Sequence, residues 1–145
     1  MIVKSPQTRD EFFKYYDLRW RILRAPWNQP KGSEQDELEG QAIHIVAVED
    51  EKIVGCGRAH FNTADEAQIR YMAVENQWQG KGVGKLILDE LENRVIEKGA
   101  KKIILHARES VVKFYEKNGY KIVKPSHTLF GSIPHFLMEK IIEHR

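Results

Sequence analysis

The sequence has only one cysteine, Cys56, in 145 residues, so it can form neither an intrachain disulfide nor a cysteine-ligated metal site. It also lacks any apolar run close to the roughly 18 residues that cross a bilayer, and its first residues do not form the apolar stretch of a signal peptide. The sequence has no large excess of positive or negative charge, because 23 Lys and Arg against 21 Asp and Glu give a formal net charge of +2. That balance does not indicate nucleic acid or an anionic membrane as the main partner. We therefore expect a reduced, cytoplasmic protein.

The composition that remains is that of a globular domain. Hydrophobic residues make up 41% and charged residues 30% of the chain, which argues against disorder. No internal repeat or low-complexity tract is present, and the two proline-bounded stretches, residues 24–32 and 124–134, are too short to separate domains. The sequence therefore predicts a single domain over residues 1–145.

Hydrophobic periodicity predicts one sheet with helices packed on it. Strand-like runs occupy residues 1–4, 43–48, 53–61, 67–74, 102–107, 120–123 and 135–142. Helical spacing and capping signals predict helices from residue 8 to 23, over 33–39, from 84 to 98 and over 110–118. Three consecutive strands in the first half indicate an antiparallel meander. The expected fold class is α+β (mixed α/β), with a sheet of six to seven strands and about four helices.

A glycine-rich turn joins the strand at 67–74 to the next helix. Gly80, Gly82 and Gly84 alternate there, and Lys81 and Lys85 add positive charge. Glycine adopts backbone conformations closed to other residues and lets a ligand approach the main chain. A helix N-terminus adds unpaired N–H groups and a partial positive charge, which together suit a phosphate or pyrophosphate. The spacing alone is also compatible with a glycine-rich turn that binds nothing.

Two common phosphate-binding signatures do not fit this turn. The P-loop requires Ser or Thr after its lysine, where this chain has Leu86. The dinucleotide fingerprint requires a third glycine, which would fall at Lys85 or at Ile87 depending on the register. A different kind of phosphate site is therefore expected.

The hexapeptide Gln79–Gly84, QGKGVG, resembles the Q/R-x-x-G-x-G/A signature of the GNAT acetyltransferase superfamily. Gln77 to Gly82 fits the same pattern, but the helix that follows Gly84 favours the later register. The run Tyr71–Val74 resembles the central strand of that family, and Phe114–Tyr120, FYEKNGY, resembles its F-Y-x-K-x-G-F/Y segment. Together with the order of the elements, the resemblance covers nearly the whole chain, and the residues SIPH and MEK near its end resemble a small bacterial subgroup of unassigned substrate.

The resemblance implies a splayed sheet and acetyl-coenzyme A as the acetyl donor. The expected pyrophosphate site comprises Gln79, Gly80, Lys81, Gly82, Val83, Gly84 and Lys85. The backbone of Met72 and Val74 is expected to pair with the pantetheine arm like an added strand. The remaining expected contacts to the donor come from Ala73, Arg108, Phe114 and Lys117. Many members carry Asn where this chain has Arg108, which is therefore expected either to reach a phosphate or to lie in solvent.

The implied reaction is direct attack of a primary amine on the thioester, without an acyl-enzyme. The family places a tyrosine at the position of Tyr115, where its phenol can hydrogen-bond the leaving thiolate; the alternative is an aromatic residue that only packs beside Phe114. His135 is the candidate general base, although a capping histidine or a water relay is equally compatible with the sequence. A backbone N–H of Met72 or Ala73 is the candidate oxyanion donor. No histidine–carboxylate spacing argues for a metal.

The acceptor is expected to be a small-molecule or peptide amine, bound by the first two helices and the loop at 24–33. Tyr15, Trp20 and Trp27 could line an apolar pocket there, although core packing is the simpler interpretation of Trp20. An acidic run could attract a cationic amine, but such a run is more often the solvated face of a short helix; its members are Glu34, Asp36, Glu37 and Glu39. Homodimers are common in the superfamily. The alternative functions are a coenzyme A-binding module without turnover and a nucleotide-binding protein.

Overall fold

The computed structural model describes residues 1–143, which form one sheet of seven strands. Along the sheet the strands follow the order β1-β2-β3-β4-β5-β7-β6. Their bounds are β1 (Ile2–Lys4), β2 (Ile43–Glu49), β3 (Lys52–Phe61), β4 (Glu66–Val74), β5 (Lys102–Arg108), β6 (Lys121–Leu129) and β7 (Ile133–Ile141). The described residues also form α1 (Arg9–Leu23), α2 (Val83–Glu97) and α3 (Val112–Lys117), with short 3-10 helices η1 (Ala25–Trp27), η2 (Glu39–Gln41), η3 (Asn76–Trp78) and η4 (Glu109–Val111).

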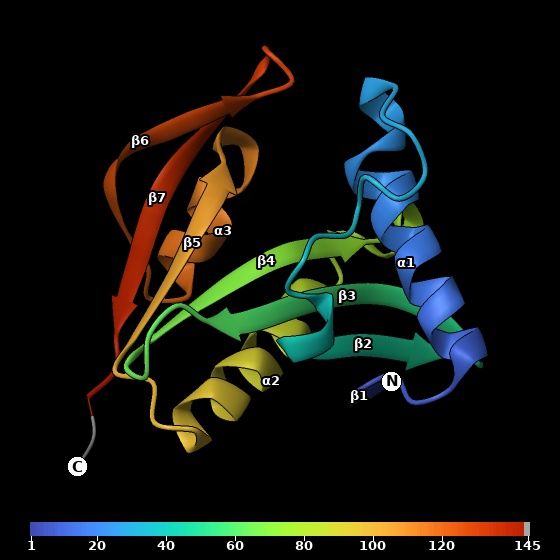
Figure 1. The fold of residues 1–145 in the computed structure, drawn as a ribbon, viewed down its shortest axis with the longest axis horizontal. Coiled ribbons are helices and arrows are strands. Elements are labelled where there is room, and N and C mark those ends of the chain that lie inside the picture. Colours follow the sequence, from blue (N-terminus) through green and yellow to red (C-terminus); the bar gives the residue numbers. More distant parts are fainter. Residues whose placement is uncertain (144–145) are drawn as a thin grey trace.

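The sheet divides where β4 and β5 part. All neighbouring strands are antiparallel except these two, which are parallel. Their pairing covers only Glu66–Ile69 and Lys102–Leu105, and beyond it the two halves of the sheet open like a V (Figure 1). From Arg70 to Val74, no described strand pairs with the side of β4 that faces β5. The splayed, mostly antiparallel sheet that was expected is confirmed.

A β-bulge lies at the start of this open edge. The register between β3 and β4 shifts between Cys56 and Arg58. On the β4 side, Tyr71 has a left-handed φ of 59°, which bulky side chains rarely adopt. Its ring is 6% exposed, and the Arg19 guanidinium lies 3.9 Å from the ring centroid. A bulge bends and twists a strand, so this one helps to turn β4 away from β5.

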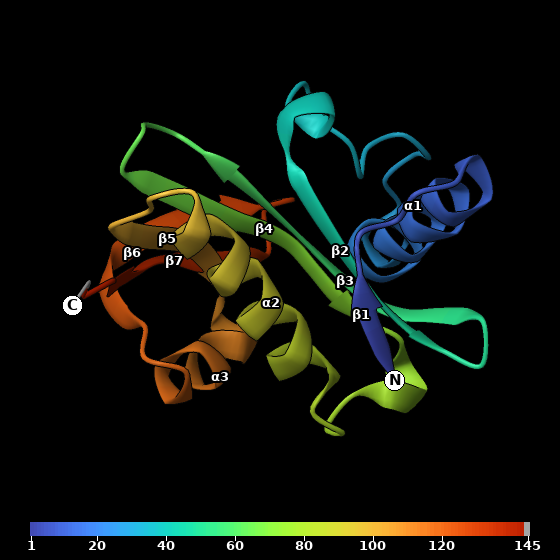
Figure 2. The same cartoon turned by 90° about the horizontal axis from the view of Figure 1, so that it is seen from below.

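The helices cover both faces of the sheet (Figure 2), with α1 on one face and α2 and α3 on the other. The alternation of strand side chains divides the core accordingly: in β2, Ile45 and Ala47 belong to the apolar core under α2, and Val46 to that under α1. The capping box predicted at the start of α1 is present, because Thr8 and Glu11 each accept a hydrogen bond from the backbone N–H of the other.

The prediction of a helix over residues 33–39 is wrong. Turns and the single-turn η2 occupy this region, so the described residues form three α-helices rather than about four. The carboxylates there hold their own loop: Asp36 accepts from the amide of Leu38 at 2.9 Å, and Glu39 accepts from the amide of Asp36 at 3.0 Å. Acidic side chains that bond nearby backbone in this way compete with helix formation.

The predicted end of β6 is also wrong. The strand continues past residue 123 to Leu129 through two irregularities in its pairing with β7, one of which includes Pro125. Because β6 is one of the two edge strands of the sheet, a proline can be accommodated there without breaking a pair of central strands. The proline-bounded stretch 124–134 is therefore largely a hairpin.

Candidate active site

A cavity of about 920 Å³ occupies the space where β4 and β5 diverge. Residues from Arg70 to Val74 and from Leu105 to Arg108 form its two strand walls. The turn that leads into α2 also lines the cavity, as do Ile22, Leu23 and Arg24 at the end of α1. Phe114, Tyr115, His127, Leu129 and His135 complete much of the lining. One continuous space thus joins the glycine-rich turn to the C-terminal end of α1.

The glycine-rich turn has the backbone that a phosphate cradle requires. Gly80 and Gly82 have φ values of +75° and +85°, and a Cβ at either position would meet no atom within 4 Å. At Gly84 a Cβ would be in van der Waals contact with the ring of Phe114, at 3.4 Å. Within the described residues, the amides of Gly80, Lys81 and Gly82 donate no hydrogen bond. These amides and the free N–H groups of the first turn of α2 form the amide cradle.

The polar side chains around the cradle each contact a different partner within the chain. The side-chain amide of Gln79 donates to the carbonyl of Val74 at 3.1 Å and so ties the turn to β4. Lys85 donates to Asp89 at 3.1 Å. The Lys81 ammonium lies 5.3 Å from the Trp78 ring centroid. Neither Lys81 nor Lys117 is among the residues that line the cavity, so the cradle is built mainly from backbone.

Tyr115 lies in α3, where it belongs to the apolar core and also lines the cavity. The residue is 6% exposed and contacts the rings of Phe114 and Tyr120 edge to face. No described residue accepts or donates a hydrogen bond at its hydroxyl. Burial raises the pKa of Tyr115, so the phenol is protonated and can donate. Tyr115 is therefore both a packed aromatic residue and a group with a free proton at the cavity.

His135 belongs to a cluster of three histidines on the cavity wall. Its ring stacks on that of His127 at 4.4 Å, and the His106 ring lies 5.3 Å from His127. Since Nδ1 of His135 is 2.9 Å from the carbonyl of Ile133, which can only accept, Nδ1 carries the proton and Nε2 of the neutral ring keeps its lone pair. Burial lowers the pKa of His135, and His127, Arg108 and His106 lower it further.

Arg108 is half-buried and lines the cavity. Its guanidinium donates to the backbone carbonyl of Leu23 at 3.3 Å and lies 4.6 Å from the Trp27 ring centroid. It therefore lines the cavity at the α1 end, and its contacts are with α1 and η1 rather than with the amide cradle. Arg24 donates to the same Leu23 carbonyl at 3.0 Å.

The family model for the GNAT acetyltransferases matches residues 12–120. The chain belongs to this family. YjcF of Bacillus subtilis (strain 168), described as an uncharacterized N-acetyltransferase, is 33% identical over 134 residues, which are 92% of each chain. The protein YyaT of the same strain is 34% identical over 145 residues, 98% of this chain and 97% of the relative. The protein is thus an acetyl-CoA-dependent N-acetyltransferase, as the QGKGVG and FYEKNGY segments predicted.

Solved structures show the same fold. An aminoglycoside 6'-N-acetyltransferase complexed with coenzyme A has a TM-score of 0.83 and is 21% identical, with 100% of this chain and 99% of that chain covered. At this identity the likeness establishes the fold, and the GNAT fold expected from the sequence is confirmed.

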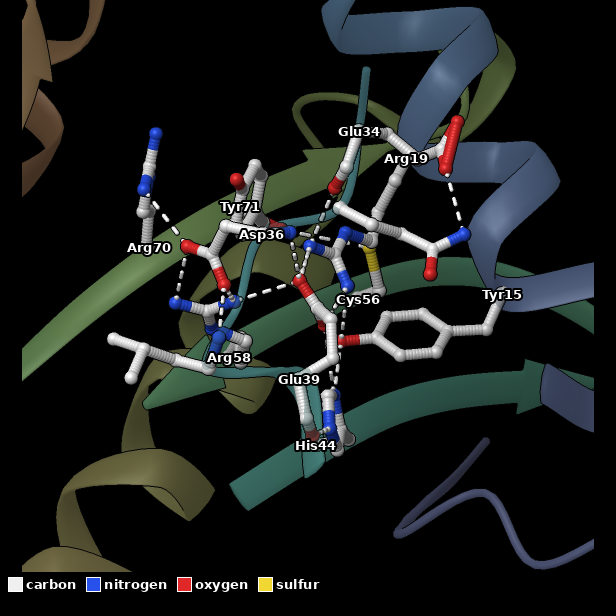
Figure 3. Close-up of polar contacts among 12 residues, drawn as sticks. Tyr15, Arg19, Glu34, Asp36, Glu39, His44, Cys56, Arg58, Arg70 and Tyr71 are labelled. Carbon is white, nitrogen blue, oxygen red and sulfur yellow. Dashed lines mark hydrogen bonds and ion pairs between the residues drawn. The ribbon is translucent and has the colours of Figure 1, made fainter. Parts of the chain in front are cut away.

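In this acetyltransferase the acidic run has a structural place that the sequence did not suggest. Arg19 and Arg58 have no exposed surface. Glu39 accepts from Arg19 at 2.8 Å and from Arg58 at 2.7 Å, and Asp36 accepts from Arg58 at 2.6 Å and from Arg70 at 2.9 Å (Figure 3). We call Arg19, Asp36, Glu39, Arg58 and Arg70 the ion-pair network.

The charges of this network are fixed by one another. Burial alone raises the pKa of Asp36, but the hydrogen bonds from Arg58 and from the Leu38 amide outweigh it and lower the pKa to about 2. Burial likewise opposes the charge of Glu39, yet the hydrogen bond and charge of Arg19 keep the pKa of Glu39 below its ordinary value. The interpretation of the run as a solvated helix face is therefore wrong for Asp36 and Glu39, whose carboxylates are occupied by arginines. Glu37 is exposed, and the carboxylate of the buried Glu34 accepts hydrogen bonds from the amide of Gly32 and the side chain of Gln35.

Other candidates of the sequence have structural places. Tyr15 is fully buried and donates to or accepts from His44 at 2.8 Å. The half-buried Trp20 donates to the carbonyl of Gln29 at 2.9 Å and so anchors the 24–33 loop. Cys56 is fully buried, and burial raises the pKa of its thiol to about 12. Within the described residues, no group of three His, Cys, Asp or Glu is arranged to hold a metal ion. No described helix is long and apolar enough to cross a membrane.

The arginine at the end of α1, Arg24, was not predicted as a site residue. An arginine in the last turn of a helix is common, because it complements the helix dipole. His106 and His127 were likewise missed as cavity residues, since nothing in the local sequence shows that their strands border a cavity.

Proposed function

We propose that this acetyltransferase moves the acetyl group from acetyl-CoA to a primary amine by direct attack within a ternary complex. The observation that carries the proposal is the single cavity, which extends from the amide cradle past Tyr115 to His135 and Arg24. Both substrates can therefore meet in one space. The amine nitrogen forms a bond to the thioester carbon, the carbon–sulfur bond breaks, one proton leaves the amine and one reaches the thiolate.

The donor end is supported by the amide cradle. Backbone N–H groups at a helix start provide bonds and a partial positive charge for a diphosphate, with no side chain needed. The open edge of β4 next to it offers N–H and C=O groups to an extended, amide-containing arm such as pantetheine. In a strand, consecutive residues direct their N–H groups to opposite sides, so either Met72 or Ala73 directs its N–H to the open edge. That N–H is the proposed oxyanion donor.

Tyr115 is the proposed partner of the leaving sulfur. A phenol with an ordinary pKa of about 10 is a weaker acid than a thiol with one of about 8.5. Full proton transfer ahead of bond cleavage is therefore uphill, and burial of Tyr115 makes it more so. The phenol is better suited to hydrogen-bond the sulfur as charge develops and to deliver its proton late.

His135 is the proposed general base. Its Nε2 is the unprotonated nitrogen of the neutral ring, and the lowered pKa of His135 keeps that ring neutral at pH 7. A covalent acyl-enzyme has little support. Cys56 does not line the cavity, and Ser110, the one serine among its described lining residues, has no hydrogen-bonded base.

The cavity does not favour an aminoglycoside, the acceptor named for the structural neighbour. An aminoglycoside is a polycation, and cationic ligands are recognised by carboxylates and aromatic rings. Among the described residues that line the cavity, none is Asp or Glu. The lining therefore does not support a polycationic acceptor.

Release of free thiol from acetyl-CoA in the presence of a panel of amines tests the proposal. We expect thiol release that depends on an amine, and a loss of kcat by about 100-fold in Tyr115→Phe. Because the ring packing is retained, calorimetric affinity for acetyl-CoA should stay within about twofold of wild type. If acetyl-CoA binds but no amine of the panel leads to thiol release, the alternative is indicated, a coenzyme A-binding module without turnover.

A further inference from the structure

The charge of the cavity lining is of one sign. Arg24, Arg70, Lys85 and Arg108 line it, together with His106, His127 and His135. No described carboxylate does so. Lys85 lies at the amide cradle, whereas the three arginines lie at the α1 end, where the acceptor is proposed to bind. A ligand with a second positive charge would meet only repulsion there.

Two of these arginines lack the partner that buried arginines normally have. Arg70 is paired with Asp36 in the ion-pair network, as Arg58 is. By contrast, Arg24 and Arg108 form no ion pair with any described residue, although Arg24 is only 8% exposed. A buried charge without a counter-charge is costly. A buried arginine without a counter-charge beside a cavity is typical of a binding site for an anion.

Both guanidiniums are held close together by one atom. Arg24 Nη1 and Arg108 Nη2 donate to the same carbonyl oxygen, that of Leu23. Burial lowers the pKa of Arg108, and the nearby charge of Arg24 lowers it further. Arg24 also donates through Nε to the carbonyl of Ser33 at 3.0 Å. Carbonyl oxygens carry only partial charges and cannot neutralise two cations, so the pair retains strong attraction for an anionic group. Guanidinium is the side-chain group best suited to bind carboxylate or phosphate through two parallel hydrogen bonds.

The arginine pair lies next to the proposed base. Arg108 of β5 and His135 of β7 are directly opposite each other in an antiparallel pair, so their side chains lie on the same face of the sheet. An anion bound by Arg108 is thus only a few bonds from an amine held by His135. A second cavity of about 400 Å³ shares Arg108 and contains Glu109, but no ion pair joins these two residues.

We infer that the acceptor is a small amine that also carries an anionic group, a carboxylate or a phosphate, and that Arg24 and Arg108 bind this group. The inference rests on the proposed function and deepens it, because it names the chemical class of the amine. It also assigns Arg108 to the acceptor rather than to the donor.

The decisive experiment measures binding to the protein saturated with coenzyme A, by calorimetry. The probes are matched pairs: glycine, alanine and 4-aminobutyrate, each against its carboxamide, and phosphoethanolamine against ethanolamine. We expect the anionic member of at least one pair to bind roughly 10- to 100-fold more tightly than its neutral partner, as expected for a charge-assisted hydrogen bond. The carboxylate and phosphate arms distinguish the two sources of the anion.

Variants then assign the effect to the two arginines. Arg108→Gln and Arg24→Gln each keep a polar side chain but remove the charge, and each should weaken the anionic probe about 10-fold or more while leaving its neutral partner within about threefold. Arg9→Gln removes the same charge from an exposed position outside the cavity and should change neither. Unchanged affinity of each variant for acetyl-CoA shows that it is folded.

The outcomes separate this inference from the proposed function. If acetyl-CoA binds and any amine releases thiol, the proposed function holds. If, at the same time, neutral probes bind as well as anionic ones, or no anionic amine binds at millimolar concentrations, the inference is overturned. If neither binding of acetyl-CoA nor thiol release occurs, the proposed function itself fails.

Discussion

The two ends of the cavity are built in different ways. The donor end is a short, contiguous run of backbone in which glycines supply the conformation and free amides supply the binding groups. The acceptor end is assembled from side chains of α1, β5 and β7, supported by the ion-pair network on the same face as α1. A backbone site binds whatever carries a diphosphate, so it can be shared by a whole family. A side-chain site can be changed one residue at a time, so it is where substrate preference resides.

The same comparison distinguishes two uses of buried arginine. Arg19 and Arg58 are fully buried and matched by Glu39 and Asp36, which fixes the loop at 34–41 against α1 and β3. Arg24 and Arg108 border the cavity and form no ion pair with any described residue. The pairing state, rather than burial, separates the arginines that hold the structure from those proposed to bind a ligand.

Glu39→Gln should have the largest effect, and it acts on the support of the acceptor end. The change leaves two fully buried guanidiniums with one full carboxylate between them, so we expect the free energy of unfolding to fall by about 3 kcal/mol in urea titrations. Glu37→Gln, at an exposed neighbouring position, is the matched control and should change it by less than about 0.5 kcal/mol. A loss below about 1 kcal/mol for Glu39→Gln would contradict a structural role of the network.

The stability contributed by the network should also depend on pH. The folded-state pKa values of Asp36 and Glu39 are lowered, that of Asp36 to about 2. Their contribution is therefore complete above the ordinary carboxyl pKa values of about 4 and is lost as the pH falls toward 2. The difference in stability between wild type and Glu39→Gln should shrink over that range.

His135→Gln should have the next largest effect, and it tests the chemistry of the acceptor end. We expect kcat/KM to fall about 100-fold with acetyl-CoA affinity unchanged. In the wild type, kcat/KM should rise with pH through a limb whose midpoint lies below 6.5, because burial and the neighbouring His127, Arg108 and His106 lower the pKa of His135. Retention of both the rate and that limb in the variant would indicate that a water relay takes the proton instead.

Gly82→Ala compared with Gly99→Ala tests the donor end. Both glycines have left-handed φ values, +85° and +97°, with open space at the Cβ position, so each change should destabilise the fold by about 1 kcal/mol. Only Gly82 lines the cavity. Calorimetry should show acetyl-CoA affinity reduced about 10-fold in Gly82→Ala and unchanged in Gly99→Ala. Equal affinities of the two variants would argue against the amide cradle.

Lys85→Gln should have the smallest effect and sharpens the claim that backbone dominates the donor end. Lys85 is exposed and already paired with Asp89 one helical turn away, so its charge contributes little to a neighbouring phosphate. We expect the dissociation constant for acetyl-CoA to rise by less than about threefold. A tenfold rise would instead assign a major part of the affinity to side-chain charge.

The backbone of the glycine-rich turn could be predicted from the sequence because its determinants are local. The alternating glycines, the following helix and the FYEKNGY segment are each contiguous, and the positive φ values of Gly80 and Gly82 match the reason for which glycine was singled out. Most strands and α1 followed from periodicity and capping in the same way.

For the acceptor end, the sequence offered His135, the first helix and the loop at 24–33 as candidates. The arrangement of its arginines could not be predicted, because their partners are distant in sequence. Arg108 bonds a carbonyl that is 85 positions away, and Arg58 meets Asp36 across 22 positions. Local rules assigned residues 33–39 to a helix with a solvated face, since spacing alone does not show that two arginines from α1 and β3 would be buried against it. The unpaired state of Arg24 is a property of the fold and has no local signal.

A two-step NMR titration tests the account most directly. Coenzyme A is added first to ¹⁵N-labelled protein, and an anionic amine such as glycine is added second. We predict that coenzyme A shifts the backbone amide signals of Gly80, Gly82 and Gly84, and that the amine then shifts the side-chain Nε–H signals of Arg24 and Arg108 but not those of Arg19 and Arg58. Shifts of the cradle amides by neither ligand, or equal shifts of all four arginines, would contradict the division of the cavity into a backbone-built donor end and an arginine-built acceptor end.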